Sequence, residues 1–170
     1  VKGRVTTIFT SRGCPYPCTY CASSNVQGKQ IRRRTAENVV QELTQLVSHY
    51  RINGFYICDD LVTGDPDWIM EFCRSLASSG LGLIWACQSR VDTLDGEMLR
   101  EMKKSGCVQI DFGVESGSDK TLRTMKKSTT VQAARQTFAM TKKVGVRSCA
   151  TFIVGFQGET EQDMEDTFRF

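Results

Sequence analysis

Hydrophobic residues along this chain form two kinds of pattern, short continuous runs and stripes that repeat every three to four residues. The runs predict buried strands and the stripes predict amphipathic helices. The expected strands cover residues 5–9, 55–58, 83–87, 108–114 and 149–154. The expected helices cover residues 35–50, 65–80, 95–104, 119–126 and 131–144, with another beginning near 160. This alternation predicts parallel strands joined by right-handed crossovers.

Two architectures have such a parallel sheet, the (β/α) barrel and the open doubly wound sheet. No Gly-x-Gly-x-x-Gly motif follows the first strand, which counts against a dinucleotide-binding open sheet. A complete barrel needs about 250 residues, and this chain has 170. We therefore predict an α/β fold, an incomplete and open (β/α) barrel of about five units, in a single domain over residues 1–170.

The loop after the first strand carries three cysteines, Cys14, Cys18 and Cys21, spaced C-x3-C-x2-C. Pro15 and Pro17 fix their own backbone and disfavour a helix, so we expect a wrapped loop with the sulfurs facing inward. Thiolates at this density suit a soft metal or an iron–sulfur cluster better than ordinary packing. The next cysteine lies a whole helix away, so a cluster held here would keep one iron open for chemistry.

Zinc and a redox-active dithiol are the alternatives at this loop. His49 is the one histidine, and it would become a fourth zinc ligand only by folding back across a helix. The chain has eight cysteines but no signal peptide and no membrane-length apolar stretch, so we expect a reducing, cytoplasmic compartment. The other cysteines are interpreted as packing residues: Cys58, Cys73, Cys87, Cys107 and Cys149.

The net charge is only +3, which gives no electrostatic argument for nucleic acid or an anionic membrane as a partner. The one basic run, Lys29 with Arg32 to Arg34, is interpreted as a solvated approach to the next helix rather than a phosphate or substrate contact. Polar, charged or glycine residues follow every predicted strand. Because chemistry in barrels collects at the carboxyl ends of the strands, these residues together predict a functional site.

The spacing C-x3-C-x-aromatic-C, with Tyr20 as the aromatic residue, resembles the signature of the radical S-adenosylmethionine (SAM) enzymes. The strand ends FYICDD (55–60), WACQSRVD (85–92), FGVESG (112–117) and FIVGFQGET (152–160) resemble the same proteins. They are most similar to the branch that often carries a cobalamin-binding domain, and next to the methylthiotransferases. The resemblance implies that Cys14, Cys18 and Cys21 are the catalytic ligands of a 4Fe–4S cluster that binds SAM and cleaves it to a 5′-deoxyadenosyl radical.

The resemblance also implies a set of SAM contacts. Asp59 and Asp60 would lie near the SAM amino group, and Glu115 would accept hydrogen bonds from the ribose. Lys127 would neutralise the methionine carboxylate, with Arg90 as the alternative partner. The adenine would pack against Tyr20 and the segment that contains Ile153 and Gly155. The chain departs from the family at Thr151, where glycine is common, and at Gln157, where proline is frequent.

The resemblance further implies that this chain is the core of a longer enzyme. We expect cobalamin, if used, to bind through a domain absent from this chain, and a sixth strand to lie beyond Phe170. The expected partners are SAM, an electron donor such as flavodoxin or ferredoxin, and an unknown small-molecule or macromolecular substrate. Methylthiolation is the alternative reaction, and a non-catalytic zinc or electron-transfer module is the rival class.

Overall fold

The computed structural model describes residues 3–170 and contains one five-stranded parallel sheet in the order β1-β4-β5-β6-β7. The strands are β1 (Val5–Ile8), β4 (Gly54–Ile57), β5 (Ile84–Ser89), β6 (Cys107–Glu115) and β7 (Arg147–Phe152). Strands of this sheet that follow one another in sequence are also neighbours in space. In a doubly wound sheet, by contrast, the strand order reverses at a switch point. The strand order therefore confirms the open, incomplete (β/α) barrel, with β1 and β7 as its edges within residues 3–170.

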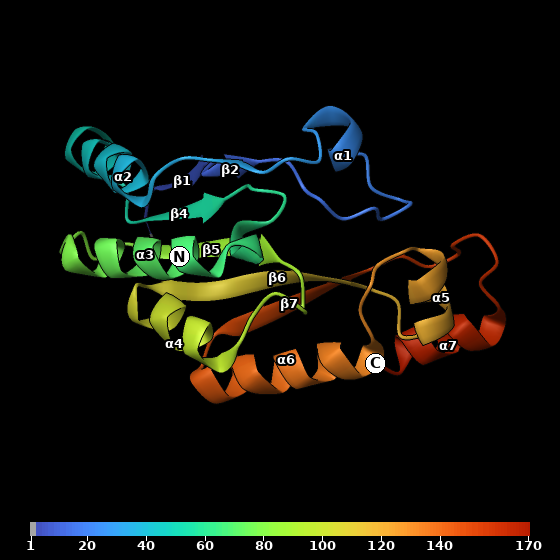
Figure 1. The fold of residues 1–170 in the computed structure, drawn as a ribbon. Coiled ribbons are helices and arrows are strands. Elements are labelled where there is room, and N and C mark those ends of the chain that lie inside the picture. The colour runs from blue at the N-terminus through green and yellow to red at the C-terminus, as the bar shows by residue number, and fades with distance from the viewer. Residues whose placement is uncertain (1–2) are drawn as a thin grey trace.

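Helices cover one face of the sheet and gather at one end of it (Figure 1). Those along the face are α2 (Ala36–Tyr50), α3 (Pro66–Ser78), α4 (Gly96–Lys104) and α6 (Val131–Val144). The shorter helices are α1 (Ser23–Val26), η1 (Val62–Gly64), α5 (Asp119–Thr124) and α7 (Glu161–Phe168). The cysteine loop with α1, and the helices α5 and α7, lie at the end to which the strands point.

The long helices begin where the sequence supplies a capping side chain. Thr35, Asp65 and Asp95 each accept a hydrogen bond from the backbone N–H three residues on, at the starts of α2, α3 and α4. Thr130 does the same for α6. Each such cap is worth about 1 kcal/mol, so the local sequence fixes where the crossover helices start.

The hydrophobic core lies between the sheet and these helices, and aromatic residues form its centre. The rings of Phe55 and Trp85 stack with centroids 6.1 Å apart. Phe72 of α3 meets both rings edge-on, with centroid distances of 6.5 and 5.8 Å. All three side chains are at most 2% exposed. The core therefore fixes β4 and β5 against α3, directly beneath the strand ends that follow them.

The opposite, concave face of the sheet carries polar side chains among apolar ones. Residues 55–58 were expected to be apolar on both faces, and that prediction is wrong because Tyr56 lies on the concave face and donates a hydrogen bond to Asp111. In a complete barrel this face would be filled with branched apolar side chains. Here it borders two cavities instead, so the concave face is available to ligands.

The sequence did not reveal the small antiparallel ribbon between β2 (Ser11–Arg12) and β3 (Arg32–Arg33). Arg33 in this ribbon is not solvated, contrary to the interpretation of the basic run. Its guanidinium lies 4.6 Å from the ring centroid of Trp68, and it donates to the carbonyl oxygens of Leu61 and Val62. Arg33 thus fastens the end of the cysteine loop to the start of α3.

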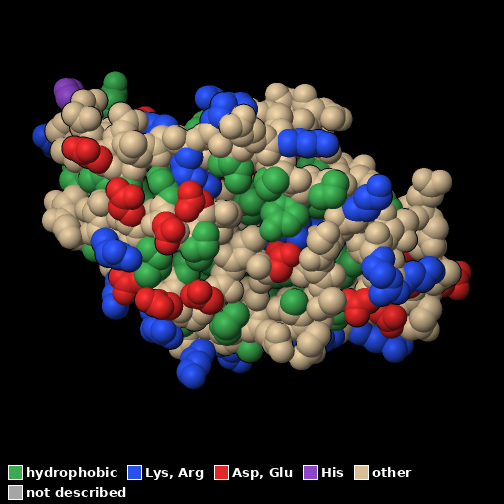
Figure 2. Space-filling view, in the orientation of Figure 1, with side chains coloured by type: hydrophobic (Ala, Val, Ile, Leu, Met, Phe, Trp, Pro, Cys, Tyr) green, Lys and Arg blue, Asp and Glu red, His purple; other side chains and the backbone are tan. Residues whose placement is uncertain are grey.

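The packing role is confirmed for Cys73, Cys87 and Cys107, which are buried, whereas Cys58 is only partly buried. It is wrong for Cys149, which is exposed because position 149 falls on the concave face of β7. Within residues 3–170, no helix has the length and apolar character to cross a membrane. Figure 2 shows basic and acidic side chains interspersed over the visible face, without one large patch of a single sign.

Candidate active site

A cavity of about 540 Å³ opens at the carboxyl ends of the strands. Eight of the residues predicted from the sequence line it: Cys14, Cys18, Cys21, Tyr20, Asp60, Arg90, Glu115 and Lys127. They come from five places in the chain: the cysteine loop, the segments that follow β4, β5 and α5, and the end of β6. The fold therefore brings together side chains that lie more than a hundred residues apart in sequence.

Backbone contacts hold the cysteine loop in place. Gly13 has a positive φ of 102°, and a Cβ there would collide with the carbonyl of Gln30, so only glycine fits. Cys14 then donates its N–H to the carbonyl of Gly28 over 3.1 Å, and Thr19 donates to the carbonyl of Met125 over 3.0 Å. The loop is thus closed on itself and tied to the segment that carries Lys127.

The three cysteines suit a multi-iron cluster better than a single ion. Three thiols from one short loop border a common cavity, as suits an iron–sulfur cluster in which each thiolate binds a different iron. The zinc alternative also loses its fourth ligand, because His49 Nδ1 contacts Gln45 and Ser48 of its own helix. Burial raises the pKa of the Cys14 thiol despite a hydrogen bond from the Tyr16 backbone.

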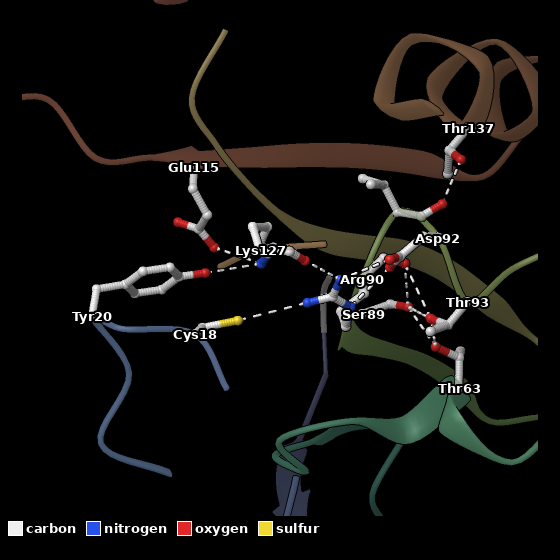
Figure 3. Close-up of polar contacts among 11 residues, drawn as sticks. Cys18, Tyr20, Thr63, Ser89, Arg90, Asp92, Thr93, Glu115, Lys127 and Thr137 are labelled. Atoms are coloured by element: carbon white, nitrogen blue, oxygen red, sulfur yellow. Dashed lines mark hydrogen bonds and ion pairs between the residues drawn. The ribbon is translucent and has the colours of Figure 1, made fainter. Parts of the chain in front are cut away.

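Arg90, after β5, links the cysteine loop to the rest of the site (Figure 3). Its Nε and Nη2 donate to the two carboxylate oxygens of Asp92 over 2.8 and 2.7 Å. Nη2 also donates to the carbonyl of Lys127, and Nη1 donates to Sγ of Cys18 over 3.7 Å. The guanidinium lies 3.7 Å from the ring centroid of Tyr16. Burial opposes the charge, but Asp92 raises the pKa of Arg90.

These contacts change the expected role of Arg90. Four of its five N–H groups already have partners in the protein, and the side chain is 7% exposed. Arg90 is therefore a poor candidate for the carboxylate of SAM, and the structure gives it the role of positioning the cysteine loop.

Lys127 and Glu115 are buried and form a cluster with Tyr20 of the cysteine loop (Figure 3). Nζ of Lys127 lies 3.0 Å from Oε1 of Glu115 and 3.0 Å from the hydroxyl of Tyr20. Burial and the Glu115 carboxylate raise the pKa of the Tyr20 phenol, so the phenol stays protonated. Gly113 leaves the room for this pair, because a Cβ there would lie 3.0 Å from Nζ of Lys127.

Strained backbone surrounds this cluster. Glu115, Lys126 and Ser128 have φ values of 72°, 52° and 55°, in the left-handed region that residues other than glycine rarely adopt. Each such residue costs roughly 1–3 kcal/mol and persists where the surrounding structure enforces it. The strain turns Glu115 at the end of β6 and places Lys127 between two left-handed residues.

The structure separates the two aspartates that follow β4. Asp60 lines the cavity, but Asp59 is 1% exposed. The carboxylate of Asp59 accepts hydrogen bonds from the Thr10 N–H over 2.7 Å, from the Thr10 hydroxyl, and from the Ser11 hydroxyl over 2.6 Å. Asp59 thus fastens the loop after β1 to β4, and we no longer expect it to contact a cofactor.

Ile153 and Gly155 are not among the residues that line the cavity. Both follow β7, which begins and ends two residues earlier than predicted. The N–H of Ile153 donates to the carbonyl of Glu115 over 2.8 Å, and the N–H of Gly155 donates to Oε2 of Glu159 over 2.6 Å. A contact of this segment with adenine therefore stays a prediction.

The sequence reasoning missed several lining residues. Tyr16, Gln109, Asp111 and Cys149 all border the cavity. One signal could have found two of them, because positions 109, 111 and 113 alternate with the buried apolar positions 110, 112 and 114 along β6. Such alternation places the polar set on one face, which here is the concave one.

Comparison with known proteins identifies the family. The model of the radical SAM superfamily matches residues 8–170. This chain belongs to the radical SAM superfamily. The match confirms the resemblance seen in the cysteine loop and the strand ends.

Relatives of this radical SAM chain include methyltransferases. An uncharacterised methyltransferase of Pyrococcus horikoshii is 34% identical over 163 residues, which are 96% of this chain and 36% of that protein. The cytidylyl-2-hydroxyethylphosphonate methyltransferase of Streptomyces wedmorensis is 31% identical over 100% of this chain and 33% of its own length. Methylthiotransferases also match. The chain spans about a third of the length of the first two relatives.

A solved structure shows the same radical SAM fold. The methyltransferase TsrM from Kitasatospora setae, solved with cobalamin and a 4Fe–4S cluster bound, superposes with a TM-score of 0.90 at 18% identity. The superposition covers 98% of this chain and 34% of TsrM. At this identity the likeness shows the fold alone, and it agrees with the incomplete barrel.

Proposed function

We propose that this chain is the catalytic core of a radical SAM enzyme. It binds a 4Fe–4S cluster through Cys14, Cys18 and Cys21, binds SAM beside the cluster, and cleaves SAM reductively to a 5′-deoxyadenosyl radical. The observation that carries the proposal is one cavity, lined both by these thiols and by polar groups suited to SAM. Membership of the radical SAM superfamily supports it.

The donor set fits the cluster. The three thiols border a common cavity, and Arg90 supplies a positive charge and an N–H donor beside Cys18, which suits the sulfur of a cluster ligand. When bound, a cluster with three protein ligands supplies single electrons and one open iron. The chain's own residues position the loop, and Tyr16 with Arg90 covers one side of it.

Polar side chains around the cavity match the chemistry of SAM. Asp60 would accept hydrogen bonds from the ammonium group, which is a charge-assisted contact. Lys127 would attract the methionine carboxylate while it orients Glu115 through Oε1. The other carboxylate oxygen of Glu115 would accept from a ribose hydroxyl. Tyr20 would present its ring to the adenine, since its hydroxyl is already held by Lys127.

Methyl transfer that depends on cobalamin is the reaction that we favour for the whole enzyme. A named methyltransferase among the relatives and the cobalamin-bound TsrM support this choice. Cobalamin would bind through a part of the protein outside this chain, and the methyl acceptor would be an unknown small molecule or macromolecule. We further propose a flavodoxin or ferredoxin as electron donor and the cytoplasm as location. Methylthiolation is the second candidate, supported by methylthiotransferases among the matches.

Anaerobic reconstitution tests the proposal. The chain is loaded with iron and sulfide, reduced, and studied by electron paramagnetic resonance with and without SAM. We expect about four iron and four sulfide per chain and a spectrum that changes when SAM is added. One zinc without sulfide would show the proposal to be wrong, and a cluster signal indifferent to SAM would favour an electron-transfer role.

Two variants act as a matched pair in this experiment. Cys18→Ala removes a proposed ligand and should abolish cluster assembly. Cys107→Ala removes a thiol that is fully buried in the core, so the cluster should still assemble. If the cluster required Cys107 as well, the assignment of three ligands would have to be abandoned.

A further inference from the structure

The concave face of the sheet carries an anionic group away from the strand ends. Oδ2 of Asp111 accepts a hydrogen bond from the Tyr56 hydroxyl over 2.7 Å, and Oδ1 accepts one from Nε2 of Gln109 over 2.8 Å. Burial and the hydrogen bond to Asp111 raise the pKa of Tyr56, so the phenol remains a donor. Two neutral donors thus hold the carboxylate in one orientation.

Within residues 3–170, Asp111, which is half-buried, forms no ion pair with a lysine or an arginine. Neutral donors hold its carboxylate instead, on the wall of the cavity, where a cationic N–H donor would make a charge-assisted hydrogen bond with it. Two sets of charges lie near it. Arg147 is exposed and borders the adjoining cavity of about 390 Å³, and the Lys127–Glu115 pair lies over Gly113, the next residue of β6 on this face.

The position of Asp111 distinguishes it from the polar groups at the rim. Asp111 lines the same cavity as the three cysteines. It lies four residues before Glu115 on β6, and the Glu115 carboxylate reaches back over Gly113, two residues or about 7 Å along the strand from Asp111. A group bound at Asp111 would therefore lie deeper on the concave face than one held by Glu115, while still sharing the cavity with the cysteine loop.

We propose that Asp111, held by Tyr56 and Gln109, binds a protonated amine or a comparable cationic N–H donor of the substrate. This inference rests on the proposed function and narrows its substrate to a class, molecules or side chains with such a cationic group. The carboxylate would anchor the cationic end by a charge-assisted hydrogen bond, and the rest of the substrate would extend along the concave face.

Cys149 offers a natural reporter for the test. It pairs with Asp111 in the sheet register, borders the same cavity and is exposed. Three methanethiosulfonate reagents of similar size serve as probes, with an ammonium, a hydroxyl or a sulfonate group on the ethyl chain. Their rates of modification at Cys149 are measured by peptide mass spectrometry on the reconstituted chain, in which the cluster protects the other thiols of the cavity.

The measured quantity is the ratio of the ammonium rate to the sulfonate rate, divided by the same ratio for free cysteine. The thiolate fraction of Cys149 cancels in this ratio. We expect the ammonium reagent to be preferred by about tenfold, which is the effect expected from one nearby, partly buried charge. Asp111→Asn should reduce the preference to about twofold or less, and Asp111→Glu, which keeps the charge, should retain most of it.

Two further variants define the source of the preference. Asp67→Asn removes an exposed carboxylate of α3, on the helix-covered face of the sheet, and should leave the ratio unchanged, whereas Arg147→Gln should increase it. An unchanged ratio in Asp111→Asn, or a Cys149 that reacts with none of the reagents, would overturn the inference. The labelling needs no SAM and is quantified on the Cys149 peptide alone, so it can be repeated on the chain without a cluster. A failure here is therefore distinct from a failure of the proposed function, which the resonance experiment decides.

Discussion

Nη1 of Arg90 donates a hydrogen bond to Sγ of Cys18 over 3.7 Å, across 72 residues of sequence. The same guanidinium lies against the ring of Tyr16 in the cysteine loop and forms an ion pair with Asp92. Arg90, at the end of β5, therefore helps to fix the position of Cys18. Because Cys18 lies in the loop after β1, the geometry of the site depends on how the strands of the sheet are packed together.

Replacing Arg90 should alter the electronic properties of the cluster. Arg90→Gln removes a positive charge and a donor from the sulfur of Cys18, and both effects lower the reduction potential, on the order of tens of millivolts. Potentiometric titration followed by electron paramagnetic resonance measures this shift. Arg74→Gln removes an exposed arginine of α3 and should leave the potential unchanged. Equal potentials in the two variants would refute a direct effect of Arg90.

The two aspartates after β4 should respond differently to the same substitution. Asp59→Asn disturbs the buried hydrogen bonds to Thr10 and Ser11, and we expect it to lower the free energy of unfolding by roughly 1–3 kcal/mol. Asp60→Asn should hardly affect stability but weaken SAM binding. Chemical denaturation and SAM titration measure the two effects. The opposite pattern would restore Asp59 as the cofactor contact.

Glu115 and Lys127 should depend on each other for stability. Each is at most 8% exposed, so Lys127→Met leaves a buried carboxylate without its partner, and Glu115→Gln leaves a buried ammonium group. In a double-mutant cycle, we expect the double variant to be more stable than the sum of the single effects predicts, by roughly 1–3 kcal/mol. Additive effects would show that the 3.0 Å contact contributes little.

Asp163 should make stability depend on acid pH. Hydrogen bonds from Lys120, Ser118 and Thr160 lower the pKa of this carboxyl well below its usual range. A carboxyl with a lowered pKa in the folded state stabilises the fold above its unfolded pKa of about 3.9, and the effect is lost as pH falls further. The difference in unfolding free energy between the wild-type chain and Asp163→Asn should therefore shrink below about pH 4. Urea unfolding at several pH values measures it, and a constant difference would contradict the assignment.

Much of the fold followed from local sequence. Capping residues such as Thr35 and Asp95 mark helix starts by chemistry that acts over three residues, so the predicted helices agree with the observed ones. The strand order also followed, because repeated crossovers of one hand place consecutive strands side by side. The ribbon of β2 and β3 was missed because its two-residue strands leave no periodic pattern.

The sequence identified many residues that line the candidate site, but not the contacts that they make there. The spacing of Cys14, Cys18 and Cys21 identifies the loop by itself. The separate roles of Asp59 and Asp60 were not predictable from the sequence. They depend on tertiary contacts, because Asp59 meets Thr10 and Ser11 while Asp60 lines the cavity. Nor was the pairing of Lys127 with Glu115, which needs both the left-handed turn at Glu115 and the missing Cβ of Gly113.

The order of the sheet has a practical consequence for handling the chain. Within residues 3–170, β1 and β7 each have one neighbouring strand in the sheet, and Val5 and Phe152 are 54% and 38% exposed there. An uncovered strand edge with apolar side chains is a template for pairing with another molecule. At high concentration the isolated chain should therefore self-associate edge to edge, and a lysine at position 5 or 152 should keep it monodisperse.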